Sequence, residues 1–234
     1  DLHIWRGDGI DTKKHPRDPF VFGHEMMGTV ASMGNKVTTD SLRNPLKEGD
    51  RIAFSYFFPC AKCYNCIRGE FGACKFRLGR KPLEEWPVCN GGFAQYYYLR
   101  SPHYIFKLPD EISNASAAPI NCALAQVYDA LHLGGVMMGD NIVIQGAGGL
   151  GINATAIANE LGASKIIVID GQKPRLDLAV QCGATDIIDM NEYDTPQSRI
   201  DRVMELTNGI GADKVVEVVG FPQVVEEGVD MVRM

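Results

Sequence analysis

Four cysteines lie within one 15-residue stretch of the chain, in the spacing C-x2-C-x2-C-x7-C. Thiolates at such short intervals can surround a single ion, and four sulfur ligands are typical of a closed tetrahedral site that holds zinc. Such a site leaves no open position for a substrate. We therefore expect the four residues to stabilise a loop and to take no part in catalysis. They are Cys60, Cys63, Cys66 and Cys74.

Two other interpretations of these cysteines remain open at this point. Disulfides are one, although the odd total of seven cysteines and the lack of a visible secretory signal favour metal ligands in a reducing, cytoplasmic setting. A zinc ribbon in a binding protein is the other. A ribbon of this kind predicts a basic surface, whereas the chain carries a net charge of −6 and has a pI near 5.4.

The composition also limits the partners of the chain. An acidic balance argues against nucleic acid, which requires a basic footprint. No apolar run in the sequence approaches the roughly 20 residues that cross a bilayer, so we expect no membrane partner either.

A glycine-rich segment at residues 146–151 fits the pattern G-x-G-x-x-G. We expect a strand before it and a helix after it, the arrangement that binds the pyrophosphate of a dinucleotide. The glycines allow a tight turn, a close backbone approach to the phosphates and close packing of helix on strand. The first helical N–H groups would then face the phosphates. The residues in question are Gly146, Gly148, Gly149, Leu150 and Gly151.

An acidic residue follows at the distance that this type of site requires. Asp170 lies 19 residues after Gly151, at the end of the next expected strand. A carboxylate there can accept both ribose hydroxyls and repel a 2′-phosphate, so the sequence favours NAD over NADP. Arg175 lies just beyond and is either a ribose or phosphate contact or an ordinary surface charge. An ordinary strand–turn–helix packed with glycines is the alternative to a nucleotide site.

The pattern of apolar and turn residues along the chain changes near residue 123. Before it, short apolar runs broken by turn residues predict strands at 21–22, 28–32, 51–58, 93–99 and 104–108. After it, expected strands at 141–145, 165–170, 186–189 and 214–219 alternate with expected helices at 120–133, 150–161, 174–182 and 197–207. This alternation indicates a parallel sheet. We therefore expect two domains, at residues 1–123 and 124–234.

Two further residues could bind a metal, although they lie far apart in the sequence. His24 stands in a Gly-His-Glu segment beside Glu25, and Cys122 precedes the α/β half. Taken alone, a single histidine is more often structural, and a single cysteine is more often a small buried apolar residue.

Together, these segments resemble the zinc-dependent medium-chain alcohol dehydrogenase family. Residues 23–37 match the zinc signature Gly-His-Glu-x2-Gly-x5-Gly-x2-Val, and residues 60–74 match the spacing of the structural zinc site. Residues 91–96 resemble the family's G-G-F-A-E-Y segment, and residues 118–123 resemble the stretch that holds the last catalytic ligand. The resemblance implies a GroES-like β-rich catalytic domain followed by a Rossmann-type doubly wound parallel sheet, both partial.

The resemblance also implies roles for individual residues. His24 and Cys122 would bind a catalytic zinc, with Glu25 beside them or as a transient ligand. Asp1 would orient His24, and His3 would be the outer station of a proton relay. The family's first zinc ligand is a cysteine that would stand two residues before Asp1. The last strands of the nucleotide sheet would follow residue 234, so we expect the chain to be the middle of a longer protein.

The function implied by the resemblance is a zinc- and NAD-dependent oxidoreductase of class EC 1.1.1. It would oxidise an alcohol or polyol to an aldehyde or ketone. Polyol, threonine and formaldehyde dehydrogenases are possibilities within the family. A different possibility is an inactive fragment that keeps structural zinc and NAD binding. The full-length enzyme would be a cytoplasmic homodimer or homotetramer.

Overall fold

The computed structural model describes residues 1–7, 21–56, 59–76, 91–99 and 103–233, and within the first helix it omits the side chains of His3 and Ile4. The chain divides into two compact units, Asp1–Cys122 and Ala123–Met234. None of the helices in these ranges combines the length and apolar composition needed to span a membrane.

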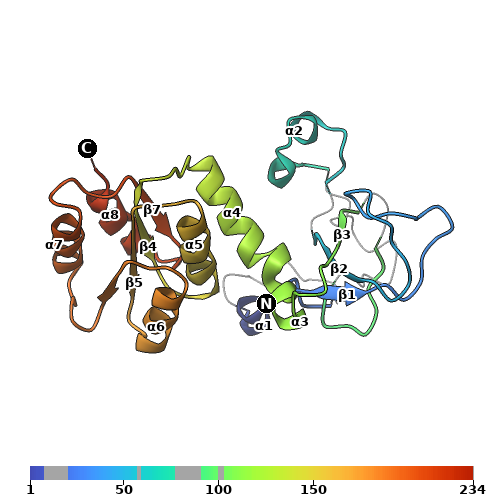
Figure 1. Ribbon diagram of the computed structural model, residues 1–234, viewed down its shortest axis with the longest axis horizontal. Helices are drawn as coiled ribbons and strands as arrows, with labels where there is room; N and C mark the ends of the chain where they lie inside the picture. Colours follow the sequence, from blue (N-terminus) through green and yellow to red (C-terminus); the bar gives the residue numbers. More distant parts are fainter. Residues whose placement is uncertain (8–20, 57–58, 77–90, 100–102, 234) are drawn as a thin grey trace. The chain divides into compact units, whose positions relative to one another are not determined.

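The first unit is built on a small antiparallel sheet in the order β1-β2-β3 (Figure 1). Gly28 of β1 lies opposite Ile52 of β2, and Ala53 lies opposite Phe106 of β3. The elements are α1 (Leu2–Arg6), β1 (Met27–Thr29), β2 (Arg51–Phe54), α2 (Tyr64–Ile67), η1 (Phe71–Ala73), β3 (Ile105–Lys107), α3 (Asn114–Ala117) and η3 (Ala118–Asn121).

The apolar core of this unit is small, and a polar network supplements it. Asp40 is buried, and its carboxylate accepts hydrogen bonds from the backbone of Leu42, Asn44 and Lys107 and from the Asn44 side chain. Burial opposes ionisation, but these donors outweigh it and lower the pKa of Asp40 below 3.8. Asp50 pairs with Lys107 at 3.0 Å. Two carboxylates thus fix the 34–50 loop against β3.

Two strands expected in this unit do not form. Residues 21–22 and 93–99 are irregular, although Gly92 N bonds Gly23 O at 2.8 Å and Phe93 N bonds Phe22 O at 2.9 Å. Two hydrogen bonds join the segments but do not make a ladder. The other expected strands are present in shortened form, and residues 57–58 of the third lie outside the described residues.

The second unit is a parallel sheet in the order β6-β5-β4-β7 with helices on both faces. The predicted organisation, a β-rich part followed by a Rossmann-type parallel sheet, is confirmed. The elements are α4 (Ala123–Leu133), β4 (Asn141–Gln145), α5 (Gly149–Glu160), β5 (Lys165–Asp170), α6 (Lys173–Gln181), β6 (Asp186–Asp189), α7 (Pro196–Leu206), β7 (Lys214–Glu217) and α8 (Pro222–Met231). Helix α8 was not expected from the sequence.

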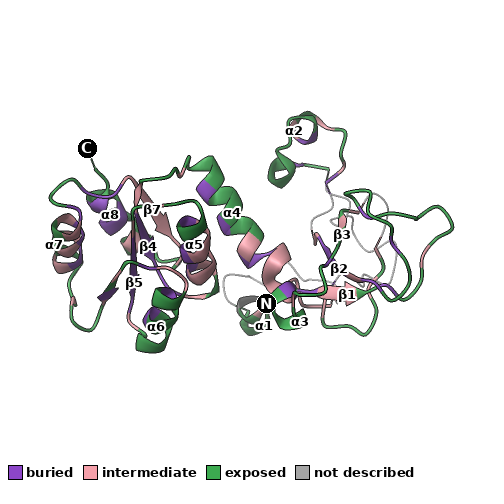
Figure 2. Ribbon diagram, in the orientation of Figure 1, coloured by how far each residue is buried: buried purple, intermediate pink, exposed green. Residues whose placement is uncertain are grey.

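The two faces of this sheet carry separate apolar clusters. β4 and β5 are buried almost throughout, as their continuous apolar sequences require (Figure 2). On one face, Ile142 and Ile144 pack with α4, α5 and α6; on the other, Val143 packs with Val203 of α7 and Met231. The alternation of side chains along β4 therefore divides the core into two layers.

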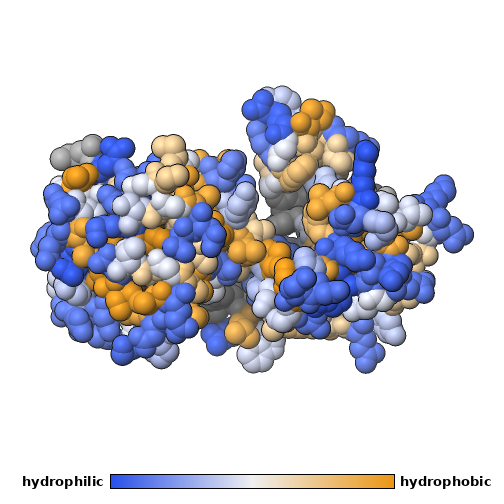
Figure 3. All heavy atoms as spheres, in the orientation of Figure 1, coloured by the Kyte–Doolittle hydropathy of each residue, from blue (hydrophilic) through white to orange (hydrophobic). Residues whose placement is uncertain are grey.

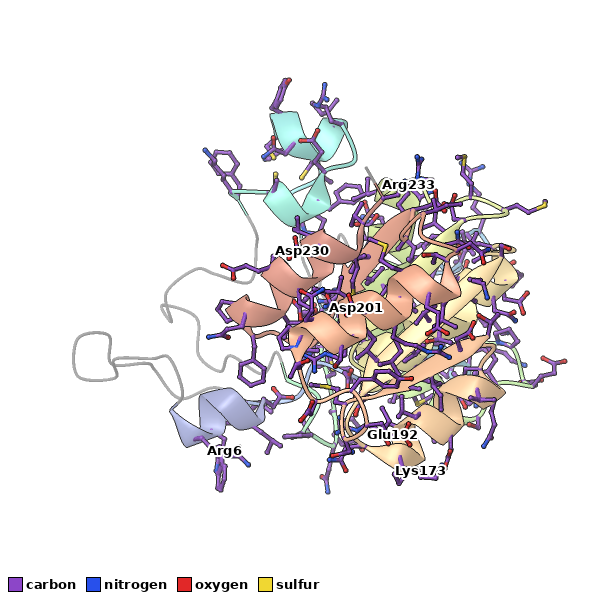
Figure 4. The ribbon with its side chains drawn as sticks, turned by 90° about the vertical axis from the view of Figure 1, so that its left-hand side faces the viewer. Arg6, Lys173, Glu192, Asp201, Asp230 and Arg233 are labelled. Carbon is purple, nitrogen blue, oxygen red and sulfur yellow. The ribbon has the colours of Figure 1, made fainter. Side chains whose placement is uncertain are left out.

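A buried ion pair joins the two helices of the second face. α7 and α8 lie side by side, with the exposed Asp201 and Asp230 marking them in Figure 4. Between them, Nε and Nη2 of Arg199 each donate to a carboxylate oxygen of Glu227 at 2.7 Å, and both side chains are 6% exposed. Arg199 Nη1 also donates to Tyr193 O at 2.9 Å, so both charges are compensated.

Replacing Glu227 with Gln should destabilise the protein by about 3–5 kcal/mol, because Arg199 then keeps a buried, unpaired charge. The joint change Arg199→Met with Glu227→Leu should cost much less, since neither charge remains. Urea-induced unfolding of the whole chain measures both. Asp177→Asn, which breaks the exposed Lys173–Asp177 pair, is the control and should cost less than about 1 kcal/mol. Equal losses for Glu227→Gln and Asp177→Asn would contradict this account.

Candidate functional site

The four clustered cysteines meet in space. Cys63 and Cys66 sulfurs are 3.5 Å apart, and both Cys60–Cys66 and Cys63–Cys74 are separated by 3.9 Å. A tetrahedron with zinc–sulfur bonds of about 2.3 Å has edges of about 3.8 Å, so the spacing fits zinc. A disulfide needs sulfurs about 2.05 Å apart, and these cysteines are free thiols. The donor set and its dimensions therefore fit a structural zinc ion.

Within the described residues 59–76, apolar burial contributes little to this lobe. Its large apolar side chains face solvent: Tyr64 is 74% exposed and Ile67 is 77% exposed, and Figure 3 shows hydrophobic atoms on the surface of the α2 lobe. Cys66 and Cys74, by contrast, are buried. A segment that buries sulfur and exposes its isoleucine needs a metal to stay folded.

The thiols of the lobe differ in acidity. A hydrogen bond from the backbone N–H of Lys62 is the main factor that lowers the pKa of Cys60 to about 6. Burial raises the pKa of Cys66 to about 12. An ion that binds all four sulfurs must displace protons from the more basic thiols, so its affinity falls as the pH falls.

His24 and Asp1 lie within hydrogen-bond distance of each other. His24 Nδ1 lies 3.1 Å from Asp1 Oδ2, and Asp1 Oδ1 accepts the Gly23 N–H at 3.2 Å. A carboxylate on Nδ1 favours the tautomer with the proton on that atom and leaves the Nε2 lone pair free for a metal. The His24 side chain is 38% exposed, so an ion can reach it.

Cys122 stands at a break in the helical segment that was expected over residues 120–133. η3 ends at Asn121, α4 begins at Ala123, and Cys122 between them has φ −123° and ψ −83°. Its thiol is buried, and burial raises its pKa, opposed by the Tyr56 hydroxyl and assisted by the negative charge of Glu25. A bound cation would stabilise the thiolate that this environment disfavours.

The structure gathers these candidates less closely than the lobe cysteines. Among the described residues, only the four lobe cysteines form a set of three or more metal-ligating groups with donor atoms within 4.8 Å. Glu25 is exposed. His3 belongs to α1, but its side chain is outside the described part, so the relay role stays a prediction. A histidine nitrogen and a cysteine sulfur are nevertheless a donor set that suits zinc.

Sequence reasoning missed Tyr56. Its hydroxyl points to Cys122 Sγ at 3.8 Å, and its ring meets the His24 ring edge-on, with centroids 5.3 Å apart. No motif marks this residue. The available signal is its place two residues after β2, which leads toward the cysteine lobe.

The glycine-rich loop has the geometry that the second unit needs for a phosphate site. Gly146 has φ +99°, a conformation that favours glycine. A Cβ on Gly151 would lie 1.8 Å from the Gly146 oxygen, so only glycine lets α5 pack this closely. Around Gly148 and Gly149, added Cβ atoms would meet nothing within 4 Å. α5 therefore begins at Gly149 on backbone without side-chain atoms, which leaves space for an anion beside its first N–H groups.

Asp170 ties this loop to β5. Its Oδ2 accepts the Ala147 N–H at 2.8 Å, and its Oδ1 accepts the Gln172 N–H at 2.8 Å. Arg175 Nη1 lies 3.7 Å from Asp170 Oδ2, whereas Lys173, labelled in Figure 4, pairs with Asp177. Each carboxylate oxygen keeps a second lone pair for a hydroxyl donor.

Replacing Cys66 with Ser should remove the ion of the lobe, because the remaining three sulfurs no longer close the tetrahedron. Native mass spectrometry of the purified chain after dialysis measures the change as the loss of one zinc per chain. Cys182→Ser is the matched control, since Cys182 lies on the second unit and is not among the clustered cysteines found in the described part of the chain. Retention of the full zinc content by Cys66→Ser would contradict the assignment.

Two family descriptions match the chain. Residues 1–110 match the alcohol dehydrogenase GroES-like domain, and residues 149–234 match the zinc-binding dehydrogenase domain. The two matches fall on the first and the second unit respectively.

Individual proteins give the same picture. An L-threonine 3-dehydrogenase of Bacillus licheniformis is 34% identical over 99% of the chain and 61% of its own length. A probable D-xylulose reductase A of Neosartorya fischeri is 32% identical, over 100% of the chain and 62% of its own length. The chain thus spans about three-fifths of these curated relatives.

Solved structures agree with the fold. An alcohol dehydrogenase from Thermotoga maritima superposes with a TM-score of 0.87 at 30% identity, over 100% of this chain and 64% of that one. An alcohol dehydrogenase from a Thermus species gives a TM-score of 0.76, also at 30% identity, with the same coverage. With both domain matches in order along the sequence, the chain belongs to the zinc-dependent medium-chain alcohol dehydrogenase family.

Proposed function

We propose that the chain is the zinc- and nucleotide-binding part of an NAD-dependent dehydrogenase. The enzyme oxidises the hydroxyl of an alcohol or polyol to an aldehyde or ketone. Relatives named as a threonine dehydrogenase and a xylulose reductase support a small hydroxylated substrate. Their differing names leave the particular alcohol open.

The observation that carries the proposal is the hydrogen bond of 3.1 Å between Asp1 and His24. It fixes the tautomer and the ring plane of a histidine that is partly open to solvent, as a ligand to an exchangeable metal position requires. Cys122 supplies a buried sulfur, and Glu25 adds a carboxylate whose charge acts on that sulfur. The catalytic ion would be held by His24 and Cys122, with Glu25 available as a further ligand.

When bound, zinc supplies Lewis acidity toward a substrate oxygen, and NAD supplies the acceptor for hydride. The Asp1 carboxylate accepts a hydrogen bond from the Nδ1–H of His24, which leaves the Nε2 lone pair available to a metal. Burial of Cys122 keeps water away from its sulfur. The backbone N–H groups at the start of α5 would bind phosphate oxygens, and the Asp170 carboxylate would accept ribose hydroxyls. Arg175, beside that carboxylate, is available to a ribose or a phosphate oxygen.

A second candidate function is a form that binds structural zinc and NAD without turnover. The observation that favours it is that only the lobe cysteines are gathered within ligand distance among the described residues. The zinc count of the native protein separates the two functions, because turnover requires a second ion and the non-catalytic form carries one.

The cellular setting and assembly of the protein belong to the same proposal. Free thiols at the six described cysteines support a reducing compartment, and we place the enzyme in the cytoplasm. We propose a homodimer or homotetramer for the complete enzyme.

Cys122→Ser should abolish alcohol-dependent reduction of NAD while leaving the affinity for NADH within about twofold, because the sulfur serves the metal and not the nucleotide. Absorbance at the NADH band measures turnover, and NADH fluorescence measures binding. Cys182→Ser should change neither. Turnover that survives in Cys122→Ser would exclude this residue as a zinc ligand.

Asp170→Asn should weaken NADH binding by roughly 10–100-fold, the worth of hydrogen bonds to a charged acceptor. The affinity for NADPH should fall less, because the neutral amide no longer repels its 2′-phosphate. The preference for NADH over NADPH should therefore shrink. Fluorescence titrations with both cofactors test this. Asp189→Asn, which neutralises the carboxylate at the end of the neighbouring strand β6, is the control; an equal effect there would refute a specific role of Asp170.

A further inference from the structure

Tyr56 contacts both of the candidate ligands that the first unit offers to a second metal ion. Its hydroxyl is oriented to donate to Cys122 Sγ over 3.8 Å. Its ring meets the His24 imidazole edge-on, with centroids 5.3 Å apart and planes at 63°. One side chain therefore links a sulfur and an imidazole that lie 98 positions apart in the sequence.

The position of Tyr56 is fixed by its surroundings. It follows β2 by two residues and packs against a buried cluster that includes Ile52 and Phe54 of that strand. Cys122 is brought to the same place by its neighbour, because Asn121 Nδ2 donates to Phe54 O at 3.1 Å. The hydroxyl and the sulfur thus meet because two backbone segments are joined next to them, not through a chance side-chain rotamer.

The chemistry of the contact depends on which atom donates. A phenol carries one proton to give, and a thiolate accepts it well because the acceptor is charged. A hydrogen bond to a metal-bound thiolate withdraws electron density from the sulfur and holds it in one direction. The edge-on contact with the Tyr56 ring limits rotation of the His24 ring. Asp1 already restrains that ring through its hydrogen bond with Nδ1.

We propose that Tyr56 is a positioning residue of the catalytic metal centre, whose hydroxyl tunes the Cys122 thiolate and whose ring restrains His24. This inference rests on the proposed function, because it presumes that His24 and Cys122 hold an ion. It assigns two separable actions to one side chain. The hydroxyl acts on the sulfur, and the ring acts on the imidazole.

The test uses the purified chain loaded with cadmium-113 and observed by NMR. Wild-type protein should show two resonances, one from the four-sulfur lobe and one from the His24–Cys122 ion. Tyr56→Phe removes only the hydroxyl. It should move the second resonance, leave the lobe resonance unchanged, and lower the affinity for the second ion by about tenfold, the usual effect of losing a partner of a metal ligand.

The ring is tested by a second variant. Tyr56→Leu should move the second cadmium resonance and also shift the side-chain nitrogen resonances of His24. Tyr56→Phe, which keeps the ring, should leave those nitrogen resonances at their wild-type positions. A purely structural role predicts no such division between the two variants.

Tyr97→Phe is the matched control. Tyr97 packs against the same apolar cluster, and its buried hydroxyl makes no hydrogen bond within the described residues. Its loss should move neither cadmium resonance.

Two results would overturn the proposal. They differ in whether they also reject the metal centre itself. Two resonances in the wild type with the second unmoved in Tyr56→Phe would reject the role of Tyr56 and leave the metal centre intact. Uptake of a single cadmium ion by the wild type would reject the metal centre proposed above, and the role of Tyr56 with it.

Discussion

Five charged side chains are buried in the described part of the chain, and each is surrounded by partners that compensate its charge. Removing a carboxylate or a guanidinium from water costs several kcal/mol, so the backbone around it must supply donors or an opposite charge. Asp40 and Asp50 gather loop and strand N–H groups, Asp170 gathers those of the glycine loop, and Arg199 pairs with Glu227. These buried charges determine how the loops run. The glycine-rich turn lies where it does because Asp170 takes the Ala147 N–H.

The same constraint governs the sulfur sites. The pKa values of the lobe thiols are widely separated, because a backbone N–H lowers that of Cys60 and burial raises that of Cys66, so the four thiols do not all ionise together in the absence of a cation. A bound ion would stabilise the thiolates and substitute for the apolar core that the described residues of the lobe lack. The Cys122 thiolate is also disfavoured, because burial and the charge of Glu25 both raise the pKa of this thiol. At both the cysteine lobe and Cys122, a bound cation would stabilise thiolates that their surroundings otherwise disfavour.

The second unit could be predicted closely from the sequence because its signals are local. The strands at 141–145 and 165–170 form with the expected bounds, since a buried parallel strand is a continuous apolar run between turn residues. The strand at 186–189 also forms with the expected bounds, although Ile188 is its one buried residue. Helix α8 also had a local signal, Pro222 at its first turn and apolar residues at helical spacing, but Gly228 interrupts it. A Cβ at that glycine would lie 2.6 Å from the Gln145 Oε1 and 3.1 Å from Val215, so the Gln145 side chain would have to shift.

The first unit was harder to predict because its contacts join distant segments. Residues 93–99 have a strand-like sequence, yet whether they form a strand depends on partners that periodicity does not reveal. Tyr56 illustrates the same limit at the candidate site. Its importance comes from a contact with Cys122 across 66 positions, which exists only because Asn121 is bonded to the end of β2. The family motif could supply His24 and Cys122, because their residue types carry the ligand chemistry. A tyrosine that acts through these ligands has no such signature, and only the packing of η3 against β2 brings it to them.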